Sequence, residues 1–273
     1  MADQVRVTQP KEYYTKFLEK DVRPDDRELG EFRQTILNIG CVSTTEGSSL
    51  VKLGNTTVIC GVKAEITQPG ADGKKGFIVP NVELSPMCSP TFRAGPPGEQ
   101  AQVLSKNMAD LITDSQCVLL ENLCICPGKL VWVLYIDMVC LDYDGNLMDA
   151  CTLALMAALK NTSLPLVTVD EDSGEIKTDP TSHTSLSMSC CPVSTSFIIF
   201  DNSILLVDPT SEEESLSTGA LTIITEGHNL CSIYKPGGTP LSDEQLNTCI
   251  ERAFTRGKEA TKLLEATFSS VKR

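Results

Sequence analysis

The chain has 273 residues, of which 41% are hydrophobic, so it has enough apolar material for a sizeable core and is not a globally disordered protein. No apolar run is long enough to span a bilayer, and the N-terminus lacks the apolar stretch of a signal peptide, so we expect no membrane contact and an intracellular location. The net charge of −13 excludes a basic face over most of the surface, so any contact with nucleic acid has to be local or shared with basic partners.

The cysteines predict neither disulfides nor a metal site. They are scattered over a large chain, and several, such as Cys60, lie inside apolar runs, where a reducing compartment leaves them as small buried hydrophobes. The pairs Cys124–Cys126 and Cys190–Cys191 do not have the spacing of zinc ligands, and the only histidines are His183 and His228. We therefore expect no metal and no cofactor.

The N-terminal part predicts a helix followed by short strands. Tyr13 and Phe17 lie at helical spacing within Pro10–Asp21, and the charged segment Arg23–Arg27 that follows is typical of a turn. Gly54-Asn55 is a hairpin signal between two of the next strands. We expect strands at Thr35–Ile39, Ser49–Leu53, Thr56–Ala64 and Phe77–Val82, and a helix at Glu99–Asp114 after the break at Gly95–Gly98.

The middle of the chain predicts one buried strand and the helix that follows it. Leu130–Leu141 is nearly all apolar, which fits a strand buried on both faces and places Trp132 in the core. Asp144-Gly145 is a turn into a helix at Met148–Lys160, whereas the polar segment Asp170–Ser189 predicts a long loop crossing a weak strand. We expect further strands at Thr195–Phe200, Ile204–Val207, Ala220–Thr225 and Leu230–Tyr234.

The last helix has the clearest local signature. Ser242 is the expected N-cap, Gln245 three residues later completes a capping box, and Leu241 and Leu246 are placed to form a hydrophobic staple. Because the sequence shows no linker and no repeat of fixed period, we expect residues 1–273 to form one compact α+β domain, in which residues 1–22 are an N-terminal helical extension.

Seven short segments occur in an order that is specific, although each alone is weak. They are Arg23–Asp25, Glu28–Arg33, Gly47–Val58, Gly95–Gly98, Asp142–Gly145, Val207–Thr210 and Lys235–Gly238. Together they resemble the RNase PH-type subunits of the RNA exosome ring, over the stretch from about Tyr13 to the C-terminus. The resemblance implies an RNase PH-like α+β fold of the ribosomal protein S5 domain 2-like type, with mixed sheets and packed helices. One departure is Asp26, because these proteins usually have glycine at that turn position.

The resemblance also implies a chemistry that this chain is expected to lack. Active family members degrade RNA from its 3′ end with inorganic phosphate as nucleophile, and a Gly-Thr-Arg or Gly-Ser-Arg turn at a helix start holds the phosphate. Cations and amide donors are needed there because phosphate repels the RNA backbone. The matching positions here are Asn146, Leu147 and Met148, followed by Asp149, which would repel phosphate. We therefore expect no phosphate site.

Active relatives further carry two acidic residues six positions apart, for metal or proton handling at the leaving oxygen. The matching positions are Glu214 and Ala220, so the second carboxylate is missing. A slip of one residue in this match would leave Asp208 and Glu212–Glu214 as acids without restoring a cation for phosphate. A short charge run is usually a solvated face, and we expect Glu212–Glu214 to be a solvated acidic turn.

Three cations are candidates for contact with RNA. Arg93 precedes Gly95–Gly98 and matches a stretch that faces the central RNA channel in relatives, and arginine suits bidentate contacts with phosphate. The alternative for Arg93 is a surface ion pair. Lys74 and Lys75 lie in a polar loop, where solvated lysines are the simpler interpretation.

The resemblance finally implies a non-catalytic structural subunit. Its partners would be other RNase PH-like subunits, paired as heterodimers within a six-membered ring, together with S1/KH cap proteins, a separate hydrolytic nuclease and RNA in the central channel. The implied processes are rRNA maturation and mRNA turnover, in the cytoplasm and in the nucleus, including the nucleolus. Two alternatives stay open: an active phosphate-dependent 3′-to-5′ exoribonuclease with displaced catalytic groups, and a stand-alone RNA-binding domain, which the net charge of −13 disfavours.

Overall fold

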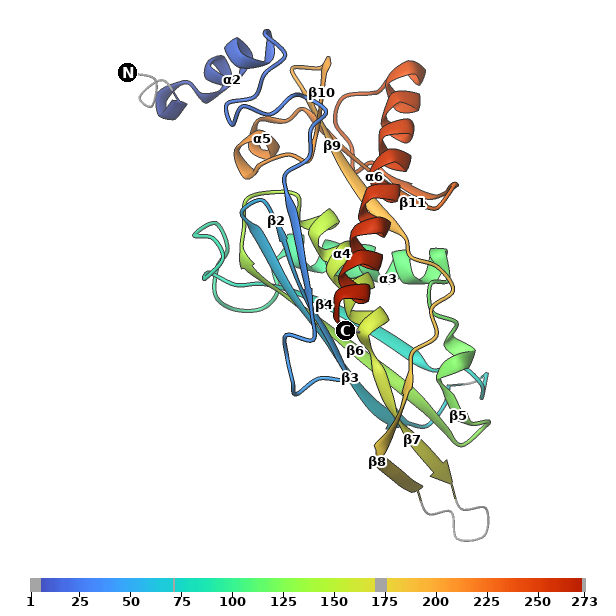
Figure 1. The fold of residues 1–273 in the computed structure, drawn as a ribbon. Helices are drawn as coiled ribbons and strands as arrows, with labels where there is room; N and C mark the ends of the chain where they lie inside the picture. Colours follow the sequence, from blue (N-terminus) through green and yellow to red (C-terminus); the bar gives the residue numbers. More distant parts are fainter. Residues whose placement is uncertain (1–5, 71, 170–175, 272–273) are drawn as a thin grey trace.

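The first layer of the fold is a mixed six-stranded sheet (Figure 1). The computed structural model describes residues 6–70, 72–169 and 176–271. The strand order is β1-β2-β3-β6-β4, with β5 paired to one end of β6, and only the pairing of β4 with β6 is parallel. The strands are β1 Thr35–Ile39, β2 Gly47–Leu53, β3 Thr56–Thr67, β4 Phe77–Leu84, β5 Cys124–Cys126 and β6 Leu130–Asp142.

The central strand β6 is buried on both faces only in its first half. Its residues Val131–Leu134 are all buried, which confirms the predicted core position of Trp132. Beyond them burial alternates, and Tyr135 is 40% exposed. The prediction of a strand buried throughout was therefore wrong for its second half, where the described part of the chain leaves one face of the sheet partly exposed. All twelve cysteines are free thiols. The predicted burial of Cys60 is confirmed, because its side chain is completely buried.

Helix α4 (Leu147–Asn161) packs between the six-stranded sheet and a second, four-stranded sheet that includes β9 (Val193–Phe200). Nearly all of its residues from Leu147 to Leu159 are buried, because it contacts β2 and β3 on one side and β9 on the other. Small residues permit this close approach. A β-carbon added to Gly47 on β2 would lie 2.7 Å from the carbonyl oxygen of Ala158, closer than packed atoms allow.

The second layer is a four-stranded antiparallel sheet with the order β10-β9-β11-β12. Every residue of β9 is buried, because α6 covers one face of the sheet beside Phe197 and α2 covers the other beside Ile198. Figure 1 shows this sheet and the start of α6 in the upper half of the molecule, with the six-stranded sheet below. The strands are β9 Val193–Phe200, β10 Ile204–Val207, β11 Gly219–Glu226 and β12 Asn229–Tyr234.

The remaining α-helices follow the sequence signals closely, with one exception. The capping box of α6 is confirmed, because the Gln245 backbone N–H donates to Ser242 Oγ at 3.2 Å and the Ser242 N–H donates to Gln245 Oε1 at 3.0 Å. The exception is α5, a short helix that the sequence analysis missed. No helix in the described ranges is both long and apolar enough to cross a bilayer. The helices are α2 Pro10–Leu18, α3 Glu99–Ser115, α5 Ser211–Leu216, α6 Asp243–Val271 and the 3-10 helix η1 Leu120–Leu123.

The segment Asp170–Ser189, predicted as a long loop crossing a weak strand, contains the ten-residue strand β8 (Ile176–Ser185). Strand β8 pairs with β7 (Ser163–Val169) as a separate two-stranded sheet at the lower end of the molecule (Figure 1). Residues 170–175 of the predicted loop lie outside the described residues. The sequence pattern was too weak to show this hairpin because only a few side chains, such as buried Leu164, pack on the core.

Candidate functional site

The candidate site lies where the turn before α4 meets the segment between β10 and α5. Gly145 in that turn has a φ of +76°, and a β-carbon on it would lie 2.5 Å from the carbonyl carbon of Thr210 and 2.6 Å from the backbone nitrogen of Ser211. The Thr56 hydroxyl also donates to the Gly145 carbonyl oxygen at 2.7 Å. Glycine is therefore required for this contact, which brings together the two segments that the sequence predicted to be degenerate.

Asp208 is a buried carboxylate that two arginines from the N-terminal segment neutralise. Arg33 donates to it from its backbone nitrogen at 2.7 Å, from Nε at 3.0 Å and from Nη2 at 2.8 Å. Arg27 Nη1 lies 3.4 Å from Oδ2 of the same carboxylate. Burial opposes ionisation, but the hydrogen bonds and charge of Arg33, with a hydrogen bond from Asn146, lower the pKa of Asp208 below its ordinary value. Asp208 therefore holds two arginines in place.

Residues Glu212–Glu214 do not form the solvated turn that was predicted. They begin α5, where the Thr210 N–H donates to Glu213 Oε2 at 2.9 Å and Glu213 completes a capping box. The Glu213 side chain is 1% exposed, and Arg23 Nε lies 3.6 Å from its Oε1. Glu212 is partly exposed and accepts a hydrogen bond from the Tyr14 hydroxyl at 2.7 Å. The prediction failed because charged partners lie far away in the sequence.

Asn146 donates hydrogen bonds to three carboxylates, those of Asp149, Asp208 and Glu214, and we call this cluster the hub. Asn146 lies in the left-handed region with a φ of 51°, and it is 2% exposed. Its side-chain nitrogen donates to Asp149 Oδ2 at 2.9 Å and to Asp208 Oδ1 at 2.6 Å. Its backbone N–H donates to Glu214 Oε1 at 2.8 Å. The amide at the start of α4 is thus already occupied by a carboxylate of the same chain.

Glu214 and Asp149 are held by neutral donors. Glu214 also accepts from the Tyr143 hydroxyl at 2.9 Å, and Asp149 accepts from the Ser196 backbone nitrogen at 3.0 Å and hydroxyl at 2.8 Å. Burial raises the pKa of both carboxyl groups above their ordinary values, and the hydrogen bonds from Asn146 and its neighbours only partly offset that effect. These contacts fix the two side chains in place rather than pointing them at a ligand.

A cleft of about 680 Å³ opens beside this hub, and we call it the α4–β11 cleft. Leu147, Met148 and Ala220, three of the four positions predicted to be degenerate, line it together with the fourth, Glu214. Among the described residues that line the cleft, none is lysine, arginine or histidine. Nor does any group of three or more His, Cys, Asp or Glu side chains in residues 6–70, 72–169 and 176–271 have an arrangement that could hold a metal ion. The cleft offers a bound anion no cation.

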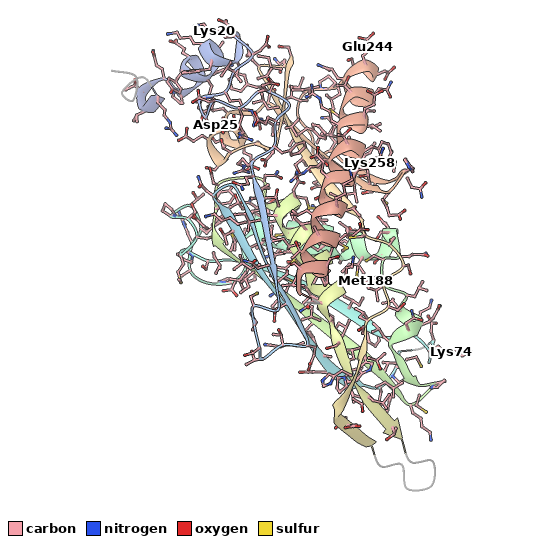
Figure 2. The ribbon with its side chains drawn as sticks, in the orientation of Figure 1. Lys20, Asp25, Lys74, Met188, Glu244 and Lys258 are labelled. Carbon is pink, nitrogen blue, oxygen red and sulfur yellow. The ribbon has the colours of Figure 1, made fainter. Side chains whose placement is uncertain are left out.

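Of the three candidate RNA contacts, Arg93 lies beside the α4–β11 cleft, whereas Lys74 and Lys75 lie far from it (Figure 2). Arg93 is exposed and lines a neighbouring cleft that shares Glu99 and Gln100 with the α4–β11 cleft. Lys74 and Lys75 are exposed, and Lys75 Nζ lies 3.9 Å from Asp72 Oδ2, an ion pair of little energetic weight. Figure 2 shows Lys74 in the lower half of the molecule, well away from α5 as Figure 1 places it. The structure therefore does not bring these cations together.

The sequence analysis missed the residues that organise the hub. Asp208 was considered only as a leftover acid, and Tyr143 and Ser196 were not singled out at all. A signal existed for Asp208, because Asp-Pro after an apolar strand is typical of a turn. Nothing local indicated its pairing with Arg33, since that contact spans 175 positions.

Comparison with known sequences shows the class of protein that this fold and site define. The profile of the 3′ exoribonuclease family, domain 1 (RNase PH), matches residues 31–165, and that of domain 2 matches residues 190–256. The chain belongs to this family, as the seven ordered segments predicted.

Several relatives of the chain are components of exosome complexes. The chain is 42% identical to the exosome complex component rrp43 of Schizosaccharomyces pombe, over 90% of this chain and 92% of the relative. It is 38% identical to the exosome complex component Rrp42 of Pyrococcus furiosus, over 93% and 92%. A chain of the Archaeoglobus fulgidus exosome, solved with RNA bound to the active site, superimposes with a TM-score of 0.81 at 35% identity, covering 92% of this chain and 96% of that one. The predicted α+β RNase PH-like fold is confirmed.

Proposed function

We propose that this chain is a non-catalytic structural subunit of an RNA exosome core ring. Family membership and the two exosome relatives, each matched over nearly its whole length, support the ring. The observation that carries the non-catalytic part is the hydrogen bond of 2.8 Å from the Asn146 backbone N–H to Glu214. A helix start attracts anions through its free amides, and here an internal carboxylate has taken that place.

The composition of the α4–β11 cleft supports the same conclusion. Phosphorolysis needs positive groups at the attacking phosphate, and loss of a single transition-state donor already costs about 100- to 1,000-fold in rate in well-studied enzymes. At the positions where active relatives have a phosphate-binding turn, this chain has Leu147 and Met148, which are 3% and 8% exposed. Asp149 and Glu214 add negative charge nearby. No arrangement of these groups stabilises a phosphate nucleophile.

Ring assembly is supported by the edges of the two sheets. Strand β4 forms one edge of the six-stranded sheet and exposes Phe77 and Val79, at 41% and 44%. Strand β12 forms one edge of the four-stranded sheet and exposes Leu230 and Ile233, at 43% and 41%. Exposed apolar edge strands tend to be covered by another chain, because they otherwise promote aggregation. The proposed neighbours are RNase PH-like subunits that pair with this chain as heterodimers.

The proposal extends to the complex as a whole. In it the ring carries S1/KH cap proteins, RNA passes through the central channel beside Arg93, and a separate hydrolytic nuclease cuts the RNA from its 3′ end. The complex would act in rRNA maturation and mRNA turnover, in the cytoplasm and in the nucleus, including the nucleolus. The support for these points is the resemblance of the chain to exosome components.

The first test is a phosphorolysis assay of the purified chain on single-stranded RNA, with inorganic phosphate and Mg²⁺. We expect no nucleoside diphosphate, either from the chain alone or from a reconstituted ring without its hydrolytic nuclease. Release of nucleoside diphosphates that disappears in the Glu214→Ala variant would overturn the proposal and make the chain an active phosphate-dependent 3′-to-5′ exoribonuclease.

A second test addresses the ring itself. We expect the chain expressed alone to self-associate, and co-expression with an RNase PH-like ring partner to yield a soluble hetero-oligomer, measured by size-exclusion chromatography with light scattering. A chain that stays monomeric when alone, with no gain in solubility from the partner, would contradict the ring assignment without bearing on catalysis.

A further inference from the structure

The α4–β11 cleft keeps the size of a binding site although it has lost the groups that hold phosphate. Its volume of about 680 Å³ lies within the range of sites that take small molecules or short peptide segments. Leu147, Met148 and Ala220 give it apolar surface, and Val103 on α3, which is 40% exposed, forms part of its opposite wall. An apolar cleft of this size can bury a large apolar side chain.

The charges and polar atoms of the cleft determine which ligand fits. Glu99, an exposed residue in the first turn of α3, and Glu214 are its charged lining residues, and both are acidic. Asn146 lines the cleft as well, and its buried side-chain oxygen has no hydrogen-bond partner among residues 6–70, 72–169 and 176–271. Asp149 and Asp208 both accept from the side-chain nitrogen of Asn146, and this fixes the orientation of the amide. The other polar atom of the amide is therefore its acceptor oxygen. The Glu99 carboxylate and the Asn146 oxygen favour a hydrogen-bond donor or a cation, and the lining offers phosphate no cation.

From this arrangement we infer that the α4–β11 cleft binds a short protein segment in which an apolar side chain is flanked by lysine or arginine. The apolar side chain fills the space beside Met148 and Ala220, and the basic neighbour pairs with Glu99 at the mouth. RNA fits less well because its phosphates would face the exposed Glu99 carboxylate in a cleft without a cation, whereas a basic segment complements Glu99. The inference rests on the proposed loss of phosphate binding, since the same cleft cannot serve both ligands.

The test uses the full chain and fluorescently labelled short synthetic peptides, each with a central leucine, methionine or phenylalanine flanked either by lysines or by glutamates. We expect fluorescence anisotropy to show binding of the lysine-flanked peptides only. Glu99→Lys should weaken binding about fivefold, as expected for losing and reversing an exposed charge pair. Val103→Arg should abolish it, because a long cation there both fills the cleft and repels the ligand.

The control is Glu251→Lys, an equal charge reversal at an exposed position of α6 that does not line the cleft. It should leave peptide binding unchanged, and thermal unfolding of all three variants checks that they fold. The inference is overturned if no peptide binds, or if binding is the same in Glu99→Lys and Val103→Arg as in the control. It is also overturned if labelled single-stranded RNA binds and only the two cleft variants lose it.

This test separates the inference from the function on which it rests. Absence of peptide binding together with absence of phosphorolysis removes the inference and leaves the non-catalytic role in place. Phosphorolysis that Glu214→Ala abolishes removes both.

Discussion

Arg33 and Asp208 lie 175 positions apart, yet three hydrogen bonds join them, one from the Arg33 backbone and two from its guanidinium. Both side chains are almost completely buried, at 7% and 0% exposed. An ion pair of this kind adds little net stability compared with an apolar pair, but removing one partner leaves a buried charge without compensation. The pair therefore specifies how the N-terminal segment attaches to the turn before α5.

We expect Asp208→Asn to lower the free energy of unfolding by about 3–5 kcal/mol, the usual cost of breaking a buried pair. Asparagine keeps the shape of the side chain and tolerates the positive φ of 49° at this position, so the loss isolates the charge. Urea unfolding followed by circular dichroism measures it. The matched control is Asp201→Asn, which also has a positive φ (47°) but lies on the surface, with Lys11 at 3.0 Å. That change should cost at most about 1 kcal/mol, and an equal loss at both sites would refute the argument.

Protein stability should depend on the charge of Glu214 in the opposite way to the charge of Asp208, which folding favours in its ionised form. The pKa of Glu214 is raised above the ordinary value of 4.5, chiefly by burial, so its protonated form is the one that folding favours. The stability that this group contributes is complete below pH 4.5 and is lost as pH rises through the folded pKa. Glu214→Gln should therefore leave stability at pH 7 unchanged or slightly higher and flatten its decline as the pH rises above 4.5. Unfolding curves over that pH range measure the change.

The companion variant separates charge from hydrogen bonding. Glu214→Ala leaves the Asn146 N–H and the Tyr143 hydroxyl without their acceptor, which should cost about 1–3 kcal/mol. Glu265→Gln, on the exposed side of α6, serves as the control and should have no effect. Equal stability of the Gln and Ala variants at position 214 would show that Glu214 does not hold the start of α4.

Two glycines with the same φ should respond differently to alanine. Gly145 and Gly128 both have a φ of +76°, where alanine costs about 1–2 kcal/mol through its β-carbon. At Gly128 no atom lies within 4 Å of the added carbon, whereas at Gly145 backbone atoms of Pro209–Ser211 lie within 2.6 Å. Gly145→Ala should therefore destabilise by several kcal/mol more than Gly128→Ala, as measured by thermal unfolding. Similar losses at the two positions would mean that the α4 and α5 turns can separate freely.

Asp26 is the position at which this chain departs from the turn that the family resemblance implies. The family resemblance implies glycine there, and Asp26 adopts the left-handed conformation, with a φ of 64°. Aspartate tolerates this conformation better than most residues but less well than glycine. We expect Asp26→Gly to stabilise the protein by about 0.5–1 kcal/mol and Asp26→Ala to destabilise it by a similar amount. The two melting temperatures, measured side by side, check the order, and a stabilising alanine would contradict it.

Local patterns in the sequence determined most of the elements. Thr35–Ile39 and Ile204–Val207 were predicted to the residue, and the Ser242–Gln245 capping box located the start of α6, because alternation, helical spacing and caps depend on near neighbours. The ordered segments also identified the family, and Leu147, Met148 and Ala220 led to the prediction that the phosphate-binding turn and the second carboxylate are replaced.

Only the tertiary structure decided what replaced those groups. Glu212–Glu214 was predicted as a solvated turn because its charges have no local partners, and the structure pairs Glu213 with Arg23 and Glu214 with Asn146. The burial of Asp208 and the joining of β7 to β8 are contacts of the same kind. They form between segments that come together only after the sheets and α4 have packed. The energy of a buried charge or of a paired strand edge therefore depends on both segments and cannot be predicted from either one alone.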